Sequence, residues 1–246
     1  MGKRVVILLL LTMNQAWSQN TLTDGAREQI NSTALRPPAN AMIWGVESSD
    51  NGGVIGTTYL DTAWARGNLK LFDSIQAVGG QPVDSLSGLA MRYNVHSNEI
   101  EILQDTYKDI KALKGEKVSA FSLEENGKPV SFINAKTLEV QKPLEGFFEI
   151  LAPGKLTLAA LHKTSVRKPN YNAAFETGSK DTKITIQQDY YVLQNGKAEK
   201  IKQNKKGILD LMKDKSEEIE AFLKVNDLDL KDRSNLTTLF ERYNRL

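Results

Sequence analysis

Short runs of β-branched and aromatic residues, separated by turn residues, most limit what this chain can fold into. They follow one another from Met42 to Ile201, and examples are "VIGTTYL", "KVSAFSL", "GFFEIL" and "TKITIQQDYYVL". Strands at such close spacing are typical of antiparallel sandwiches and barrels. We therefore predict a mainly β protein, with an antiparallel sandwich or barrel-like domain over residues 41–203. The order of the strands, and so the choice between sandwich and barrel, stays open at this stage.

Asn-Gly dipeptides give part of this prediction a register. Asn126-Gly127 lies in "FSLEENGKPVSF", and Asn-Gly is the favoured dipeptide of a two-residue hairpin turn. A turn there places Phe121 opposite Phe132, so that apolar side chains pair across the two strands. A second Asn-Gly pair, at 195–196, predicts another hairpin in the same way.

The stretch "LAMRYNVHSNEIEIL", residues 89–103, is richer than any other in residue types used for catalysis. A two-residue turn at Ser97-Asn98 would place Val95 opposite Ile100 on an apolar face. The polar residues then share the other face, which we expect to be solvated, with His96 meeting Glu99 and Asn94 meeting Glu101. This polar cluster consists of Arg92, Asn94, His96, Glu99 and Glu101.

Two interpretations of the polar cluster are open. As a half-buried hairpin, it needs no ligand, because its charges pair across the strands. As a functional site, Glu99 and Glu101 would form the carboxylate pair of a hydrolase with His96 beside them. His96 and Glu99 also have the spacing of two metal ligands, although two ligands alone make a weak site. We favour the structural interpretation.

Other catalytic signals are missing from the sequence. It contains no G-x-S-x-G elbow, no phosphate-binding loop and no H-E-x-x-H motif. The absence of cysteine excludes disulfides and thiolate metal sites. Only two histidines are present, and His162 has no acidic neighbour in sequence, so we expect it at the surface or at a strand edge. We predict no catalytic residues, no cofactor and no metal.

The first 18 residues have the layout of a secretory signal peptide. Lys3 and Arg4 precede a short apolar run, and Ala16 and Ser18 stand where small residues precede a cleavage site. Residues 19–40 read as a polar leader or linker. Without residues 1–18 the chain has 30 basic and 30 acidic residues, from 32 and 30 in the whole chain. This balance argues against nucleic acid as a partner, and no apolar run is long enough to predict a transmembrane helix.

After Ile201 the apolar residues change to a helical period. We predict a C-terminal helical segment over residues 204–246, with Asp214 and Glu217 at capping-box spacing and Asp229 or Asp232 as a later helix cap. An apolar stripe must cover something, either the β domain or a partner protein. The possible partner-binding helix face consists of Ile219, Phe222, Leu223, Leu236, Leu239, Phe240 and Tyr243.

The assembled pattern resembles an uncharacterised type of secreted or envelope protein of the Bacteroidota. The resemblance rests on "GTTYLDTAWARGNLKL" (56–71), "MRYNVHSNEIEI" (91–102), "GFFEIL" (146–151), the lysine-rich helical end "KKGILDLMKDKSEEIEAFLK" (205–224) and "YN" at 243–244. It implies an exported or envelope protein with a β domain and a helical tail, and it implies no reaction and no ligand.

These observations together favour one function over two alternatives. We expect an exported, non-enzymatic envelope protein that binds a protein or a cell-surface component, in the periplasm, at the outer-membrane periphery or outside the cell. The first alternative is a β domain that binds a small apolar or sugar ligand. The second is a hydrolase that uses the polar face of the 89–103 hairpin.

Overall fold

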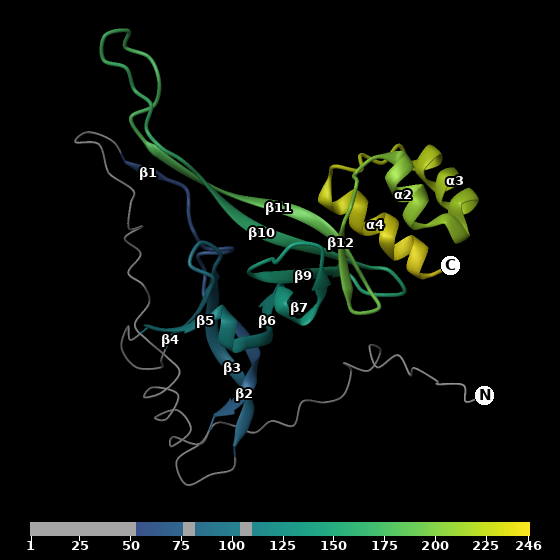
Figure 1. Ribbon diagram of the computed structural model, residues 1–246, viewed down its shortest axis with the longest axis horizontal. Helices are drawn as coiled ribbons and strands as arrows, with labels where there is room; N and C mark the ends of the chain where they lie inside the picture. Colours follow the sequence, from purple (N-terminus) through teal and green to yellow (C-terminus); the bar gives the residue numbers. More distant parts are fainter. Residues whose placement is uncertain (1–52, 76–81, 104–109) are drawn as a thin grey trace.

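The computed structural model describes residues 53–75, 82–103 and 110–246. The segments predicted as signal peptide and leader lie outside these residues. Twelve strands form one unclosed sheet in the order β5-β4-β3-β2-β6-β7-β9-β10-β11-β12-β8, with β1 beside β11, and helices follow at the C-terminus (Figure 1). The predicted class, mainly β with a helical end, is confirmed, and the arrangement is sandwich-like. The sheet is mixed rather than purely antiparallel, since β1 runs parallel to β11 and β8 parallel to β12.

The strands are β1 (Val54–Ile55), β2 (Ala65–Ile75), β3 (Val83–Asn94), β4 (Glu99–Leu103), β5 (Ile110–Lys114), β6 (Val118–Glu125), β7 (Lys128–Asn134), β8 (Glu139–Val140), β9 (Phe147–Ala152), β10 (Thr157–Arg167), β11 (Thr182–Gln194) and β12 (Lys197–Lys200). The helices are α2 (Lys205–Leu211), α3 (Ser216–Asn226) and α4 (Arg233–Asn244). The 3-10 turns are η1 (Gly115–Lys117), η2 (Ala135–Thr137) and η3 (Lys213–Lys215).

The two Asn-Gly hairpins form as the sequence predicts. Phe121 lies opposite Phe132 in the β6–β7 pair, and β11 pairs with β12 around the second turn. Asn126 and Asn195 both have a φ near +50°, the left-handed conformation that the favoured two-residue turn requires. Local turn chemistry was therefore sufficient to set these registers.

Strands β2 to β7 and the start of β9 surround the first apolar core. Its centre is aromatic: the centroids of the stacked Phe121 and Phe132 rings are 4.4 Å apart. Tyr93 and Phe147 contact Phe121 and each other in tilted or edge-on geometry. All four side chains are buried. Aromatic pairs in this geometry add to the free energy gained by burial, so this cluster holds the first half of the sheet together.

Strand β9 and the adjoining parts of β10 and β11 are buried on both faces. Along β10, Leu158 and Ala160 pack on the helical side, whereas Ala159 and Leu161 pack on the opposite side. Such alternation follows from the two-residue period of a strand. It makes this part of the sheet the middle layer between the helices and the loop that contains η2 and β8.

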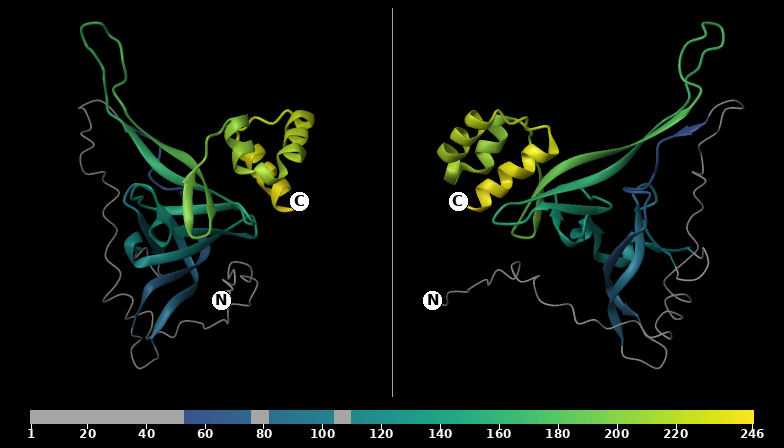
Figure 2. Two further views of the ribbon diagram at one scale, coloured as in Figure 1. Left: turned by 45° about the vertical axis from the view of Figure 1, so that its right-hand side comes forward. Right: turned by 180° about the vertical axis from the view of Figure 1, so that it is seen from behind.

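The C-terminal helices cover one face of β9, β10 and the inner part of β11 (Figure 2). Of the predicted helix face, Ile219, Leu236, Leu239, Phe240 and Tyr243 are buried at 0–4% exposure, and Phe222 and Leu223 are partly buried beside them. The structure therefore favours the intramolecular alternative: this face packs on the chain's own sheet. None of the helices in the described part of the chain combines the length and apolarity needed to cross a membrane.

Helix caps and one terminal side chain fix the orientation of α4. Asp232 accepts a hydrogen bond from the Asn235 amide at 2.9 Å and is the N-cap, as predicted. Asn244 clamps the other end, because its amide group bonds both the N–H and the carbonyl of Leu156. The predicted capping role of Asp214 is wrong, since α3 begins at Ser216 without a side-chain cap and Asp214 instead accepts from the Tyr243 hydroxyl.

Beyond the body of the protein, β10 and β11 continue as a long arm, along which β1 pairs with β11 at Thr182 and Lys183 (Figure 1). We use "arm" for residues 163–187, which include the loop 168–181 at its tip. Strand β9 pairs with β10 only as far as Leu161, so the outer part of β10 has β11 as its sole partner strand within the described residues. Both views of Figure 2 show the arm projecting away from the core.

Candidate functional site

The hairpin that carries the predicted polar cluster forms, but its predicted turn is wrong. Asn94 lies opposite Glu99 and Arg92 opposite Glu101, so residues 95–98 make a four-residue loop. The Asn94 side chain accepts from the amides of His96 and Ser97 and thereby closes the loop. Because the shift is two residues, every side chain that remains in the paired strands keeps its predicted face, whereas Val95 and His96 lie in the loop.

The polar face of this hairpin is covered rather than solvated. Glu99 and Glu101 are each 1% exposed and Asn94 is 5% exposed. The segment 57–64 pairs with the end of β3, with Leu60 donating to the Tyr93 carbonyl and Val95 donating to the Thr58 carbonyl. The Tyr59 side chain reaches Glu101 from this segment. The expectation of a wet face is therefore corrected: a strand-like segment from earlier in the chain buries it.

Arg92 and Glu101 are the centre of this covered face. The Arg92 Nε donates to Glu101 at 2.8 Å, and the guanidinium lies 4.0 Å from the centroid of the Tyr59 ring and 4.3 Å from that of Trp64. Tyr59 in turn donates its hydroxyl to Glu101 at 2.9 Å. Burial, followed by the bond to Glu101, raises the Tyr59 pKa. The hydrogen-bonding groups of Glu101, Arg92 and Tyr59 are therefore partnered within the protein. We call this cluster a structural clamp, because its contacts hold the segment 57–64 on the hairpin.

His96 lies apart from the buried members of the polar cluster. Its Nδ1 is 2.9 Å from the Thr164 hydroxyl of β10. The structure thus brings together Arg92 and Glu101 but does not assemble the five residues around one point. Among the described residues there is also no group of three or more histidine, aspartate or glutamate side chains placed to hold a metal ion. This geometry favours the structural interpretation of the cluster.

A second buried charge cluster joins β9, β10 and α4. His162 Nε2 donates to Glu149 at 2.6 Å, and the Arg233 guanidinium binds both oxygens of the same carboxylate. Glu149 is 4% exposed and His162 is 7% exposed, so the expectation of a surface His162 is wrong. Its acidic partner is 13 residues away and becomes a neighbour only through the pairing of β9 with β10.

We expect the Glu149 carboxylate to make stability depend on pH. Burial alone would raise its pKa, but hydrogen bonds from His162 and Arg233 outweigh burial and the net shift is downward. A lowered folded-state pKa means that the stabilisation is present above the ordinary glutamate value, about 4.3, and is lost as pH falls through the folded-state pKa. In urea unfolding at several pH values, the advantage of the wild type over Glu149→Gln should therefore shrink below about pH 4.3.

The matched control for this titration is Glu241→Gln, on the exposed side of α4. It should follow the wild-type pH profile within about 0.5 kcal/mol. An unchanged gap between wild type and Glu149→Gln from neutral to acidic pH would contradict the role given to this carboxylate.

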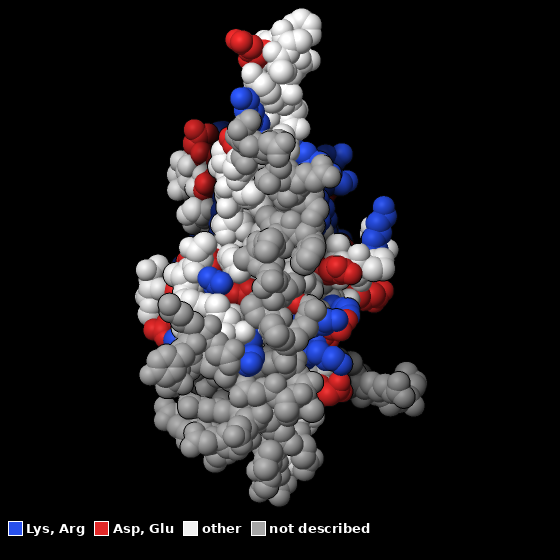
Figure 3. All heavy atoms as spheres, turned by 90° about the vertical axis from the view of Figure 1, so that its left-hand side faces the viewer, with Lys and Arg blue, Asp and Glu red and all other residues white. Residues whose placement is uncertain are grey.

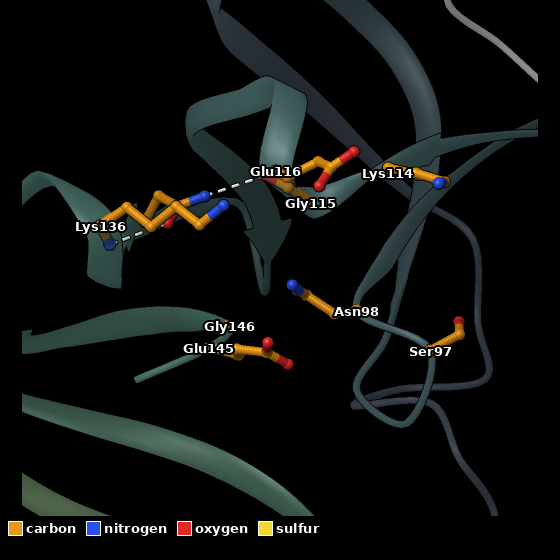
Figure 4. Close-up of a pocket in the computed structure, with 9 residues that line it drawn as sticks. Ser97, Asn98, Lys114, Gly115, Glu116, Lys136, Glu145 and Gly146 are labelled. Carbon is orange, nitrogen blue, oxygen red and sulfur yellow. Dashed lines mark hydrogen bonds between the residues drawn. The ribbon is translucent and has the colours of Figure 1, made fainter. Parts of the chain in front are cut away.

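A polar pocket of about 280 Å³ opens between four short stretches of the chain (Figure 4). All nine of its lining residues are polar or glycine, so it does not suit an apolar ligand. They are Ser97, Asn98, Lys114, Gly115, Glu116, Asn134, Lys136, Glu145 and Gly146. No sequence pattern marks any of these residues as part of a binding site, because they come from four separate stretches that only the folded sheet brings together.

The tip of the arm carries the most exposed aromatic side chain of the described residues. Phe175 is 75% exposed and Tyr171 is 38% exposed. The ammonium group of Lys180 lies 4.4 Å from the centroid of the Tyr171 ring. On the face shown in Figure 3 the tip is mostly uncharged surface, with an acidic and a basic side chain beside it.

Comparisons of the chain with protein-family models, curated proteins and solved structures find no match. Functional assignment therefore depends on the residues and geometry described above.

Proposed function

We propose that this is an exported envelope protein that binds another protein through the tip of its arm and catalyses no reaction. The observation that carries the proposal is Phe175, a large apolar side chain held at the end of a projecting hairpin with three quarters of its surface in water. Contiguous exposed apolar surface marks interaction sites, whereas single exposed apolar residues are common. On the arm, Tyr171 and Val166 are also exposed, each at 38%. Export is supported by the signal-peptide layout of residues 1–18.

Hydrogen bonds order the tip before any partner arrives. Asn170 donates its amide to the Ser179 carbonyl and accepts from the Ser179 amide, while Asn172 pairs with Thr177. Gly178 has a φ of +94°, and a Cβ there would lie 2.4 Å from the Asn170 carbonyl oxygen. A rigid tip loses little conformational entropy on binding, which favours affinity.

The apolar area at the tip fits a protein pocket better than a membrane. Removing one phenylalanine side chain from water contributes roughly 1.5–3 kcal/mol. A single myristoyl chain has far more apolar area and still binds membranes only marginally. In a protein–protein interface, by contrast, one aromatic anchor in a fitted pocket carries a large share of the binding energy. We therefore propose a protein with an apolar pocket as the partner.

Replacing Phe175 by serine should lower recovery of the partner. We expect roughly a tenfold or greater loss when the full-length exported protein is purified from its native cells after mild crosslinking, because an interface anchor is removed. Val225→Ser is the matched control, since Val225 is 83% exposed but lies at the end of α3 in the helical segment. Equal recovery with Phe175→Ser and wild type would refute the proposal, and so would an equal loss with Val225→Ser.

A further inference from the structure

The pocket between the loops is a separate candidate for binding, and its floor is rigid. Asn98 has a φ of +52° and accepts a hydrogen bond from the Tyr93 hydroxyl at 3.0 Å. Burial raises the Tyr93 pKa well above its ordinary value, so this hydroxyl keeps its proton and remains a donor. The bond fixes which way the Asn98 amide faces: its oxygen is held by Tyr93, and its nitrogen points into the pocket (Figure 4).

Glycine and a second asparagine complete this floor. A Cβ on Gly115 would lie 2.5 Å from the Asn98 side-chain oxygen. The Asn98 amide can therefore occupy this position only because residue 115 is glycine. Asn134 donates to the carbonyls of Gly115 and Val118 at 2.9 and 2.7 Å and accepts from the Lys136 amide. The Asn134 side chain thus makes its hydrogen bonds within the protein. The amide nitrogen of Asn98 is left as the side-chain donor on the floor that points into the pocket.

The rim carries both signs of charge in equal number. Lys114 and Lys136 are cationic, Glu116 and Glu145 are anionic, and all four are exposed. No ion pair joins any of them to another of the described residues. In Figure 4, Lys136 and Glu116 lie on one side of the pocket and Glu145 on the other, with the Asn98 amide between them.

This charge pattern selects a class of ligand. A lone phosphate would meet two carboxylates, and a lone cation would meet two ammonium groups, so neither is matched by the rim. A sugar would stack a C–H face on an aromatic ring, and no lining residue is aromatic. A small molecule with a carboxylate and an ammonium group can satisfy both signs at once through charge-assisted hydrogen bonds.

We propose that this pocket binds a small zwitterion, a free amino acid or a short peptide with both termini charged. The ligand carboxylate accepts from the Asn98 amide and the rim lysines, and its ammonium group donates to Glu116 and Glu145.

Titration of the full-length exported protein with L-alanine and glycylglycine tests this proposal. The readout is the ¹H–¹⁵N NMR signal of the Asn98 side-chain amide. We expect a saturable shift with at least one zwitterion, and the stronger binder distinguishes a free amino acid from a peptide. N-acetyl-L-alanine lacks the ammonium group and L-alaninamide lacks the carboxylate, so each should bind roughly tenfold or more weakly. D-glucose should cause no shift.

Calorimetric measurement of ligand binding to matched variants assigns the roles of the individual pocket residues. Asn98→Asp should weaken binding of the zwitterion roughly tenfold or more, because it replaces the donor with a carboxylate oxygen. Asn126→Asp is its control, since Asn126 has the same left-handed conformation in a hairpin turn but does not line the pocket. The pair Lys114→Gln/Lys136→Gln should weaken L-alanine more than L-alaninamide. No saturable shift with either zwitterion, equal binding of D-glucose, or unchanged affinity in a folded Asn98→Asp variant would each overturn the proposal.

Discussion

Replacing Arg233 by methionine is expected to lower the free energy of unfolding by about 2–4 kcal/mol. The variant leaves the Glu149 carboxylate buried with His162 as its remaining ionisable partner. Breaking a fully buried ion pair costs about 3–5 kcal/mol. The expected range is lower here because the Arg233 side chain is 40% exposed and solvent screens part of the interaction. Urea unfolding at neutral pH measures the difference.

Two further variants separate this interaction from general effects on α4. Arg245→Met removes an exposed ion pair with Glu241 at the end of the same helix and should change stability by less than about 0.5 kcal/mol. In the double variant Glu149→Gln/Arg233→Met, the cost should be smaller than the sum of the single costs, because the two residues contact each other. Strict additivity would show that the bidentate contact contributes little.

Phe240→Ala is expected to lower the free energy of unfolding of the whole protein by about 3–5 kcal/mol. Phe240 is 0% exposed and packs with Leu236, Leu239 and Tyr243 against β9, β10 and β11. Removing most of a buried aromatic side chain loses its transfer free energy and leaves a cavity. Because the helices complete one face of the sheet, strand and helix signals in circular dichroism should change in a single transition at lower urea concentration.

Val225→Ala is the control for this second prediction. Val225 lies on α3 and is 83% exposed, so its truncation should change stability by less than about 0.5 kcal/mol. If Phe240→Ala instead melted the helices while the strand signal kept its wild-type midpoint, the helical segment would be an independent unit. The assignment of the predicted helix face to the core of this protein would then be wrong.

Features set by neighbouring residues could be predicted from the sequence. Asn126-Gly127 determines the β6–β7 register through the backbone conformation of two residues. Asp232 caps α4 because its side chain reaches an amide three residues later. The helical period of Leu236, Leu239, Phe240 and Tyr243 identifies the buried face directly.

Features that depend on distant contacts could not be predicted. The 89–103 hairpin differs by two residues from its predicted register, because Asn94 closes a longer loop and the Gly115 amide donates to the Asn98 carbonyl. Its polar face is covered by residues 57–64, whose position no local pattern reveals. Arg233 is 84 residues from Glu149, so only the docking of α4 on the sheet brings them together.

The candidate sites likewise depend on contacts between residues that are distant in sequence. The stretch richest in catalytic residue types proves to be a satisfied clamp around Arg92 and Glu101. The polar pocket is built from lysines, glutamates and glycines that look ordinary in sequence. Phe175 likewise lies in a loop with no apolar period, and its significance comes from its exposure at the end of the arm.

The most direct test of the proposed function places a photo-crosslinking amino acid at position 175 of the full-length protein in its native cells, with position 225 as the matched site. We expect one dominant protein adduct at position 175 and none at position 225. An excess of unlabelled wild-type protein should reduce the yield of that adduct, whereas an excess of the Phe175→Ser variant should not. The absence of an adduct at position 175, or the same adducts at both positions, would contradict the proposal that the arm binds a specific protein partner.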